Sequence, residues 1–372
     1  MKIGLVCPYD IMGAGGVQEV VRASYEGLTA RGHKVRIISP RPRRYKGKEP
    51  KDHIFIGQSA NFKSIFKTTG QISAAVDTEA IDTMLGKEKF DVLHFHEPWV
   101  PLVSRQILMR SKSKNVATFH AKLPDTFVTK SIERTITPYI KPMLEYFNAL
   151  TAVSEPAAVW TRSLSSIPIQ IIPNGIDLSK YKTNGYKPLE SPRTILYVGR
   201  LEKRKGVHYL IKAFAELQKK RHDIRLIIAG NGASRRTLEE YVTENNIKNI
   251  SFPGFVDEET KLRLMHEATL FCSPALYGES FGIVLLEAMA CGLVTVAGDN
   301  PGYMSVLQDT GSMSLVDPKD TDKFVNLLNL LIDDEKLRTA WKKWAKDNVG
   351  QYEYSKIVDQ YEALYKKVAA GK

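Results

Sequence analysis

Short apolar runs and amphipathic segments alternate along the first half of the chain. The segments between the runs carry apolar residues at helical spacing, as in 17–30, where Val17, Val20, Val21 and Leu28 share one stripe. Runs of strand length cover 2–7, 35–39, 54–56, 92–95, 116–119, 150–153 and 170–172. Strands that alternate with helices are typical of a parallel sheet covered by helices on both faces. The pattern therefore predicts a doubly wound α/β domain.

A second series of the same kind follows a turn-rich stretch that extends from Asn174-Gly175 to Pro192. Its expected strands are 195–198, 225–228, 250–252, 270–272, 294–297 and 314–316, and its expected helices are 207–220, 235–245, 258–266 and 281–291. Three further helices are expected at 322–332, 336–348 and 355–368. A chain of 372 residues suits two domains. We expect one domain over 1–173 and a second over 190–350, with the helix in 351–372 packed back onto the first.

Composition excludes some classes of protein. Apolar residues make up 43% and charged residues 25% of the chain, which is ordinary for a globular protein, and no apolar run of about 18 residues is present. The N-terminus reads as a first strand without the features of a signal peptide. Cys7, Cys272 and Cys291 lie in apolar runs and predict neither a disulfide framework nor a metal set. We therefore expect a cytoplasmic protein.

The net charge of +12 indicates anionic partners, such as phosphorylated substrates, anionic lipid or nucleic acid. A local basic cluster comprises Arg41, Arg43, Arg44, Lys46, Lys48 and Lys51. It is either a contact with an anionic membrane surface or a solvated loop. Aromatic and basic residues are not interleaved as on a platform for bases, so nucleic acid is not expected as a partner.

The stretch 270–292 carries the strongest chemical signal. A strand-like run precedes a turn and a helix expected over 281–291, with Ser280 as its cap and Gly292 at its end. Glu287 is the only polar residue from Ile283 to Cys291, and a buried carboxylate is costly unless it is paired. Glu279 precedes the helix, whose first N–H groups form a ready anion site. This arrangement suits a nucleotide-sugar, although Glu287 could instead be a structural carboxylate paired with an arginine.

Other strand ends also carry polar chemistry, and in open α/β sheets ligands bind beyond the carboxyl ends of strands. Arg200 ends one expected strand and Lys205 precedes the next helix, so the two cations could clamp a diphosphate unless they form an exposed charged turn. His96-Glu97 and His120 end two strands of the first domain. Their spacing does not fit a metal site, so we predict no metal and a loop-fixing role for His96 and Glu97.

The first turn after a strand contains Gly13, Gly15 and Gly16, which suggests a nucleotide-binding turn. The dinucleotide fingerprint would need a glycine near position 18, where Gln18 stands, and an acid after the second strand, where Ser39-Pro40-Arg41 stands. An arginine could serve a 2′-phosphate. An NADP-dependent oxidoreductase is therefore left as an alternative.

Taken together, these motifs resemble a known family. Gly278-Glu279-Ser280-Phe281-Gly282 followed by Glu287, Gly199-Arg200 and Lys205-Gly206 resemble the retaining GT-B glycosyltransferases of family four. The likeness extends over nearly the whole chain, and the opening residues 4–9 are similar to those of the phosphatidylinositol mannosyltransferases of actinobacteria. The resemblance implies two Rossmann-like domains with a cleft between them.

The resemblance also implies an activity and a set of site residues. The activity is metal-independent transfer of a hexose, such as mannose, from a GDP- or UDP-sugar to a lipid or polyol acceptor at the cytoplasmic membrane face, with no tightly bound cofactor. The implied donor-binding residues are Gly16, Arg200, Lys205, Glu279, Phe281, Gly282, Ile283, Val284 and Glu287. The implied acceptor-binding residues are Tyr9, Gln18 and His120. Four of these, His120, Glu279, Arg200 and Lys205, are implied to be catalytic.

One segment departs from the family pattern. The lipid-using relatives carry a dense basic stretch before the His-x-His-Glu strand, whereas residues 77–85 are acidic here. Either the basic cluster at 41–51 makes the membrane contact instead, at about 1 kcal/mol per basic residue, or the acceptor is not a lipid.

Overall fold

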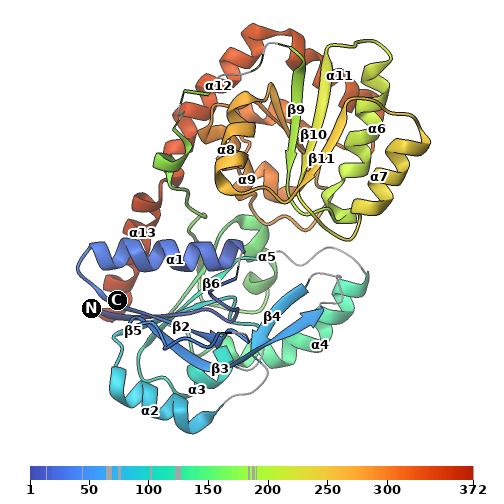
Figure 1. Ribbon diagram of the computed structural model, residues 1–372. Helices are drawn as coiled ribbons and strands as arrows, with labels where there is room; N and C mark the ends of the chain where they lie inside the picture. The colour runs from blue at the N-terminus through green and yellow to red at the C-terminus, as the bar shows by residue number, and fades with distance from the viewer. Residues whose placement is uncertain are drawn as a thin grey trace. The chain divides into compact units, whose positions relative to one another are not determined.

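The computed structural model describes residues 1–13, 15–43, 45–63, 69–73, 77–100, 103–121, 127–182, 185–186, 189 and 191–371. The chain divides into two compact units (Figure 1). Unit 1 comprises residues 1–175 together with 354–372, and unit 2 comprises residues 176–353. The chain thus passes into unit 2 at Ile176, near the start of the turn-rich stretch, and returns to unit 1 for its last helix.

Unit 1 is built on an eight-stranded sheet with the order β4-β3-β2-β1-β5-β6-β7-β8. The strands are β1 (Lys2–Val6), β2 (Lys34–Arg41), β3 (His53–Lys63), β4 (Thr69–Ser73), β5 (Val92–His96), β6 (Lys114–Phe119), β7 (Ala149–Ala152) and β8 (Ile169–Ile171). All neighbours pair in parallel except β3 and β4. The strand order reverses between β1 and β5, which is where doubly wound folds bind their ligands.

Helices cover this sheet. They are α1 (Gly16–Ala30), α2 (Thr78–Glu88), α3 (Val103–Arg110), α4 (Phe127–Leu144), α5 (Glu155–Arg162) and α13 (Tyr354–Ala369). The predicted strands of unit 1 are all present, but β4 was not predicted. Its sequence, Thr-Gly-Gln-Ile-Ser, lacks the apolar run or alternation that marks a strand.

The C-terminal helix α13 packs against α1 and the core of unit 1. Figure 1 shows the two helices side by side, although more than 300 residues of chain separate them. Val358 and Tyr365 lie in the same buried cluster as Leu5 and Val21. Gly27 of α1 makes the close approach possible, because a Cβ there would lie 2.7 Å from Val358 Cγ2.

Unit 2 contains a six-stranded parallel sheet with the order β11-β10-β9-β12-β13-β14. The strands are β9 (Arg193–Val198), β10 (Ile224–Ala229), β11 (Ile250–Gly254), β12 (Leu270–Ser273), β13 (Thr295–Gly298) and β14 (Leu315–Val316). The helices are α6 (Val207–Gln218), α7 (Arg235–Glu244), α8 (Glu258–Glu267), α9 (Ile283–Ala290), α10 (Pro301–Met304), α11 (Thr321–Asp333) and α12 (Glu335–Val349). The strand order reverses between β9 and β12, as in the Rossmann fold. The predicted α/β class and two-sheet organisation are therefore confirmed.

The start of α9 differs from the prediction. The helix begins at Ile283 rather than Phe281, and Gly282, not Ser280, is its N-cap. Gly282 has a φ of 107°, a left-handed conformation that favours glycine, and it provides no side-chain cap. The prediction chose Ser280 because serine is a common N-cap residue, but the backbone at the N-cap requires a glycine.

The contact between α1 and α13 yields a stability prediction. We expect Gly27→Ala to destabilise the protein by about 1–2 kcal/mol, because crowding of Val358 outweighs the gain of about 1 kcal/mol in helix propensity. Gly86→Ala in α2 is the matched control, since nothing lies within 4 Å of a Cβ there, and it should stabilise. Urea unfolding measures both. Equal effects of the two substitutions would contradict the packing argument.

Candidate active site

In unit 2, two loops meet beyond the carboxyl ends of β9 and β12. The turn η2 (Lys203–Lys205) follows β9, and residues 274–282 connect β12 to α9. Leu276 N donates a hydrogen bond to Arg204 O at 2.8 Å, and a Cβ on Gly206 would lie 1.9 Å from Pro274 O. Backbone contacts therefore fix these loops against each other before any side chain is considered.

The two loops bring a chain of alternating charges together. Glu279 Oε1 pairs with Arg204 Nη1 at 2.5 Å and with Lys205 Nζ at 2.8 Å. Glu202 links Arg204 to Arg200, at 2.9 Å and 3.0 Å. The predicted site residues Arg200, Lys205 and Glu279 thus lie in one cluster. Lys205 and Glu279 are largely buried in it, while the Arg200 side chain is 56% exposed.

Sequence reasoning missed Arg204, although it stands beside Lys205 in the same charged turn. Burial alone would lower the pKa of Arg204, but the carboxylates of Glu279 and Glu202 outweigh that effect and raise it. Arg204 also donates to Gly278 O at 3.2 Å. It therefore holds the Glu279 loop through both a carboxylate and a carbonyl oxygen.

Glu287, inside α9, is buried and paired. Its Oε1 accepts from Lys261 Nζ at 3.0 Å and from Tyr181 OH at 3.1 Å. Lys261 also pairs with Glu258 at 2.9 Å. Burial would lower the pKa of Lys261, but the Glu287 carboxylate reverses this shift and the pKa is raised. Glu287 is thus paired with a lysine from α8, whereas the structural alternative drawn from the sequence pairs it with an arginine.

The N-terminus of α9 lies next in sequence to Glu279. Ile283 and Val284 are its first two residues, so their N–H groups have no carbonyl acceptor within the helix. The Phe281 ring is buried against Tyr352, with 5.6 Å between ring centroids, which leaves its backbone for any ligand contact. The N-terminus of α9, together with the side chains of Arg200 and Lys205, favours the binding of an anion.

Two glycines after β10 lie close to the backbone that follows β9. A Cβ on Gly230 would lie 1.9 Å from Gly199 O, and one on Gly232 would lie 2.4 Å from Leu201 O. These glycines therefore admit the backbone that follows β9.

In unit 1, the residues beyond β1 surround a tight turn. Gly16 is the first residue of α1, and the Gln18 side chain lies over Gly15, where a Cβ would meet Gln18 Oε1 at 2.4 Å. Gln18 Nε2 donates to Asp10 O at 3.4 Å. Burial, and then the charge of Glu97, raises the pKa of Tyr9. Tyr9 thus lies near the end of β5, on the other side of the strand reversal.

The ends of β5 and β6 carry a buried polar cluster. His96 Nδ1 lies 2.9 Å from His120 Nε2, and Glu97 Oε1 accepts from the backbone N–H groups of His120 and Ala121, each at 2.5 Å. Glu97 has a φ of 49°, which is unusual for a residue other than glycine. The loop-fixing role predicted for Glu97 and His96 is confirmed, and it holds His120 in place.

Burial keeps these histidines neutral. It lowers the pKa of His120 to about 3, that of His94 to about 3, and that of His96 well below its ordinary value. Burial raises the pKa of the Glu97 carboxyl to about 7, against the opposing backbone N–H groups. A neutral imidazole of such low basicity is a poor general base, so His120 is suited to hydrogen bonding rather than proton transfer at neutral pH.

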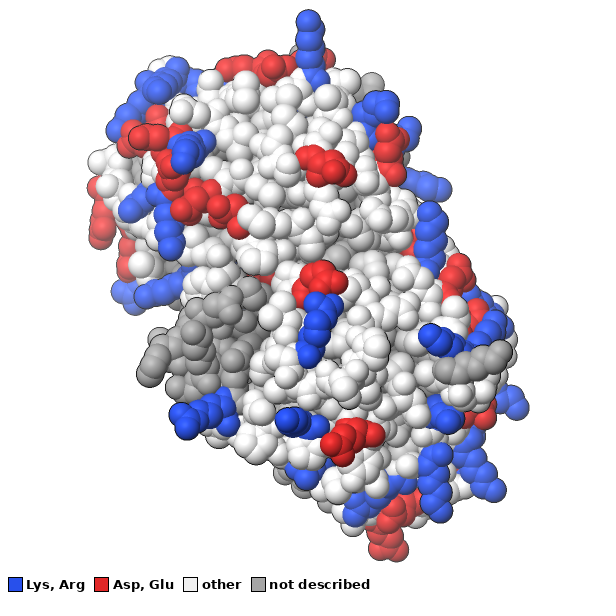
Figure 2. Space-filling model, turned by 180° about the vertical axis from the view of Figure 1, so that it is seen from behind, with Lys and Arg blue, Asp and Glu red and all other residues white. Residues whose placement is uncertain are grey.

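Basic side chains are scattered over the surface. On the face drawn in Figure 2 most of them lie toward the margins, interspersed with acidic ones, and a few lie near the middle. In the basic cluster, Arg41 pairs with Glu49 at 3.7 Å and stacks over the Phe55 ring, while Lys46 and Lys48 are exposed. Arg44 lies outside the described residues. The cluster is therefore partly neutralised and partly open to solvent.

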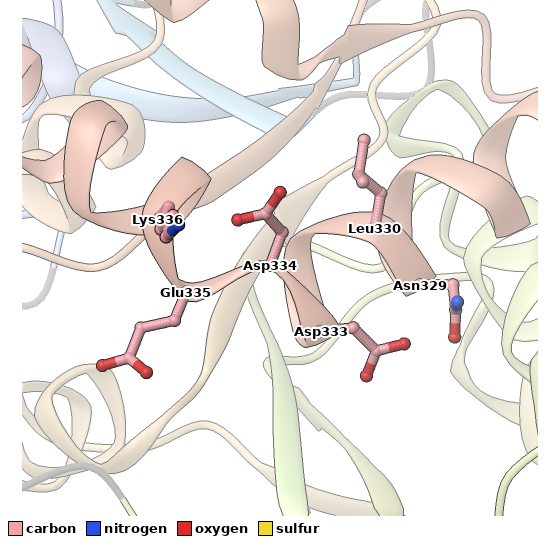
Figure 3. Close-up of a pocket in the computed structure, with 6 residues that line it drawn as sticks. All are labelled: Asn329, Leu330, Asp333, Asp334, Glu335 and Lys336. Atoms are coloured by element: carbon pink, nitrogen blue, oxygen red, sulfur yellow. The ribbon is translucent and has the colours of Figure 1, made fainter.

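An open hollow of about 640 Å³ lies at the turn between α11 and α12 (Figure 3). It is lined by Asn329, Leu330, Asp333, Asp334, Glu335 and Lys336. Asp333 pairs with Arg221 at 2.7 Å, and Asp334 caps α12 through Leu337 N. None of the predicted site residues lines this hollow, and two of its acids have structural partners.

Two features are absent from the described part of the chain. No helix there is both long enough and apolar enough to cross a bilayer. No group of three or more His, Cys, Asp or Glu side chains there could hold a metal ion.

Comparisons with known proteins agree with this geometry. Residues 14–180 match the family described as Glycosyltransferase Family 4, and residues 183–348 match Glycosyl transferases group 1. The chain is 32% identical over 378 residues to the phosphatidyl-myo-inositol mannosyltransferase of Mycolicibacterium smegmatis, covering 100% of this chain and 95% of that protein. It is 28% identical to the N-acetyl-alpha-D-glucosaminyl L-malate synthase of Bacillus anthracis, covering 98% and 96%.

Solved structures share the fold. Sucrose-phosphate synthase from Thermosynechococcus elongatus has a TM-score of 0.78 at 22% identity, with 100% of both chains covered. Anabaena HepE, solved in complex with UDP and glucose, has a TM-score of 0.76 at 17% identity, with 99% of this chain and 100% of that chain covered.

The fold and site define a glycosyltransferase of GT-B architecture, a class of enzyme that uses nucleotide-sugar donors. The chain belongs to glycosyltransferase family 4, and the phosphatidyl-myo-inositol mannosyltransferases are among its full-length relatives. Membership of this family removes the basis for an oxidoreductase.

The neutral histidines predict a pH dependence of stability. Their folded pKa values lie below the unfolded value of 6.5, so the stability they contribute is present above pH 6.5 and is lost as pH falls. The raised pKa of Glu97 acts in the opposite direction between pH 4.5 and 7. We expect hydrogen exchange in β5 and β6 to show a free energy of opening that falls from pH 6.5 to 5. His96→Gln should make that slope shallower by about 1.4 kcal/mol per pH unit, and an unchanged slope would contradict this account.

The contact between the two loops of unit 2 predicts a loss of nucleotide binding. Gly206 and Gly292 have nearly the same φ, 69° and 66°, but only a Cβ on Gly206 would meet another backbone. Gly206→Ala should weaken GDP or UDP binding by at least about tenfold, equivalent to about 1.4 kcal/mol, because the turn must move away from Pro274. Gly292→Ala carries the same backbone strain and should retain affinity in calorimetry. Similar losses in both variants would refute the role of this contact.

Proposed function

We propose that this chain transfers mannose from GDP-mannose to phosphatidylinositol at the cytoplasmic membrane face, with retention of anomeric configuration. The observation that supports this proposal most directly is the Arg204–Glu279–Lys205 cluster, which lies beside the start of α9 at the strand reversal of unit 2. It occurs in a chain with a full-length relative named for mannosyl transfer to phosphatidyl-myo-inositol.

The donor chemistry follows from the charges. When the bond to the sugar breaks, negative charge develops on the leaving diphosphate. Arg200, Lys205 and the N–H groups of Ile283 and Val284 would stabilise that charge more strongly than the charge of the intact donor. Glu279 would accept hydrogen bonds from sugar hydroxyls and Glu287 from the ribose. No step of this scheme calls for a metal ion.

Retention would result from attack on the face that the nucleotide leaves. Glu279, the carboxylate proposed to contact the sugar, is paired with two cations that lower its nucleophilicity. This pairing supports a scheme in which no protein nucleophile forms a lasting bond to the sugar.

The acceptor would be held by unit 1. Tyr9 and Gln18 would face the inositol head group, and His120 would hydrogen-bond sugar or acceptor hydroxyls in its neutral form. Gly16 would admit the donor phosphates at the start of α1. The exposed lysines of the basic cluster, Lys46 and Lys48, would contact anionic lipid.

A second candidate is a family-four transferase with a soluble acceptor. The observation that favours it is the acidic helix α2, which begins with Asp77 and Glu79 and would be repelled by an anionic membrane. The relative named N-acetyl-alpha-D-glucosaminyl L-malate synthase suggests L-malate as an alternative acceptor to test.

The proposal predicts which variants lose transfer. With GDP-mannose and phosphatidylinositol vesicles, the wild-type chain should form a mannolipid. Arg200→Ala and Lys205→Ala should each lower kcat by about a hundredfold or more, as expected when stabilisation of developing charge is lost. Glu279→Gln should lower kcat as well, because Arg204 and Lys205 lose the carboxylate that pairs with both of them. Radiolabelled product on thin-layer plates measures the rate, and NMR of the product reports the anomeric configuration.

Lys203→Ala is the matched control, because Lys203 lies in the same turn, is exposed and should be dispensable. Wild-type turnover in a folded Lys205→Ala variant would refute the donor site. Transfer to malate from UDP-N-acetylglucosamine, with none to the lipid, would favour the second candidate. A thermal shift with NADPH and none with GDP or UDP would overturn both.

A further inference from the structure

A continuous row of buried side chains runs from helix α13 to the strand ends of unit 1. Tyr365 OH lies 2.6 Å from His94 Nδ1, and the His94 and His96 rings lie 4.2 Å apart between centroids. His96 Nδ1 is 2.9 Å from His120 Nε2. Tyr365, His94 and His96 are fully buried. The C-terminal helix is thereby connected to the residue that the proposed function places at the transferred sugar.

The assignment of donors and acceptors fixes which nitrogen of His94 carries the proton. Thr151 donates its hydroxyl proton to Ala117 O at 3.0 Å, so Thr118 must donate to Thr151 Oγ1 at 2.6 Å. With its proton committed, Thr118 can only accept from His94 Nε2 at 2.6 Å. His94 Nε2 therefore carries the proton of the neutral ring, Nδ1 is an acceptor, and Tyr365 is the donor to it.

The next ring in the row has less support. Within the described part of the chain, His96 Nε2 has no hydrogen-bond partner. The orientation of the His96 ring therefore depends on stacking against His94 on one side and on the hydrogen bond to His120 on the other. A change in the tilt of His94 passes to His120 because little else holds His96.

We propose that Tyr365 and His94 are positioning residues for His120, so that the C-terminal helix sets the orientation of that imidazole during transfer. The proposal rests on the proposed function for the role of His120 in transfer, but the coupling of the rings does not depend on the acceptor. Removal of the Tyr365 hydroxyl leaves a buried acceptor at His94 Nδ1 without its donor. The His94 ring then loses the hydrogen bond at Nδ1 that holds its orientation, and it can tilt against His96.

Two tyrosines of α13 provide a matched pair of variants. Tyr365 contacts a histidine nitrogen, whereas the Tyr361 hydroxyl lies 3.3 Å from Thr118 Oγ1. The Tyr361 ring is tilted against the same His94, with 5.0 Å between ring centroids. Both substitutions to phenylalanine remove one buried hydroxyl and keep the ring. A second pair is Thr118→Ser, which keeps the acceptor for His94, and Thr118→Val, which removes it.

The first measurement is NMR of the protein with ¹⁵N-labelled histidine. We expect His94 of the wild type to be the Nε2-protonated tautomer. Tyr365→Phe and Thr118→Val should shift the ring ¹⁵N resonances of His94, His96 and His120, whereas Tyr361→Phe and Thr118→Ser should leave those of His120 in place. An Nδ1-protonated His94 in the wild type, or an unmoved His120 in folded Tyr365→Phe, overturns the proposal.

The second measurement is steady-state kinetics with GDP-mannose and phosphatidylinositol vesicles. Tyr365→Phe should lower kcat by about tenfold or more at an unchanged KM for the donor, since misplacing a reacting group by about 1 Å costs up to about a hundredfold. Equal kcat values for Tyr365→Phe and Tyr361→Phe overturn the positioning role. If His120→Ala leaves transfer unchanged, the proposed role of His120 fails, while the NMR result still decides whether the rings are coupled.

Discussion

Glu279, shared between Arg204 and Lys205, is the interaction on which the unit 2 site depends. A partly buried ion pair contributes little net stability, because desolvation offsets most of the attraction. Its arrangement therefore needs other support, which the backbone provides: Leu276 N bonds Arg204 O, and Gly206 and Gly302 admit neighbouring carbonyl groups at distances that no Cβ would allow. The charges are thus oriented before a ligand arrives, which is the condition for strong electrostatic stabilisation.

Unit 1 uses the opposite electrostatics at the equivalent strand reversal. Burial keeps His96, His120 and His94 neutral. The Glu97 carboxylate accepts hydrogen bonds from two backbone N–H groups. A neutral cluster of this kind orients hydroxyl groups and has little attraction for a phosphate. One fold, repeated in one chain, therefore carries a cluster of charged side chains at the strand reversal of unit 2 and a cluster of neutral polar side chains at that of unit 1.

Much of this could be predicted from local sequence, and the errors share a cause. Arg200, Lys205 and Glu279 were predicted to lie together because each follows a strand or precedes a helix, which are positions that the apolar pattern locates, and they do share one cluster. Arg204 and Lys261 were missed because their partners, Glu279 and Glu287, lie 75 and 26 residues away. The local sequence of a basic turn is the same whether the turn is exposed or belongs to a buried ion-pair network. Only the fold decides this, because it brings the distant carboxylates to the turn.

The sequence by itself determined the alternation of strands and helices apart from β4 and α10, the doubly wound class of both sheets and the strand ends that carry chemistry. These depend on periodicity, which reports the face that each segment buries. Only the tertiary structure decided which buried faces meet: that Tyr365 donates to His94 across 271 residues, that Lys261 neutralises Glu287, and that α9 begins at a left-handed glycine. Periodicity identifies a face but not its partner, because the partner is set by the packing of the whole unit.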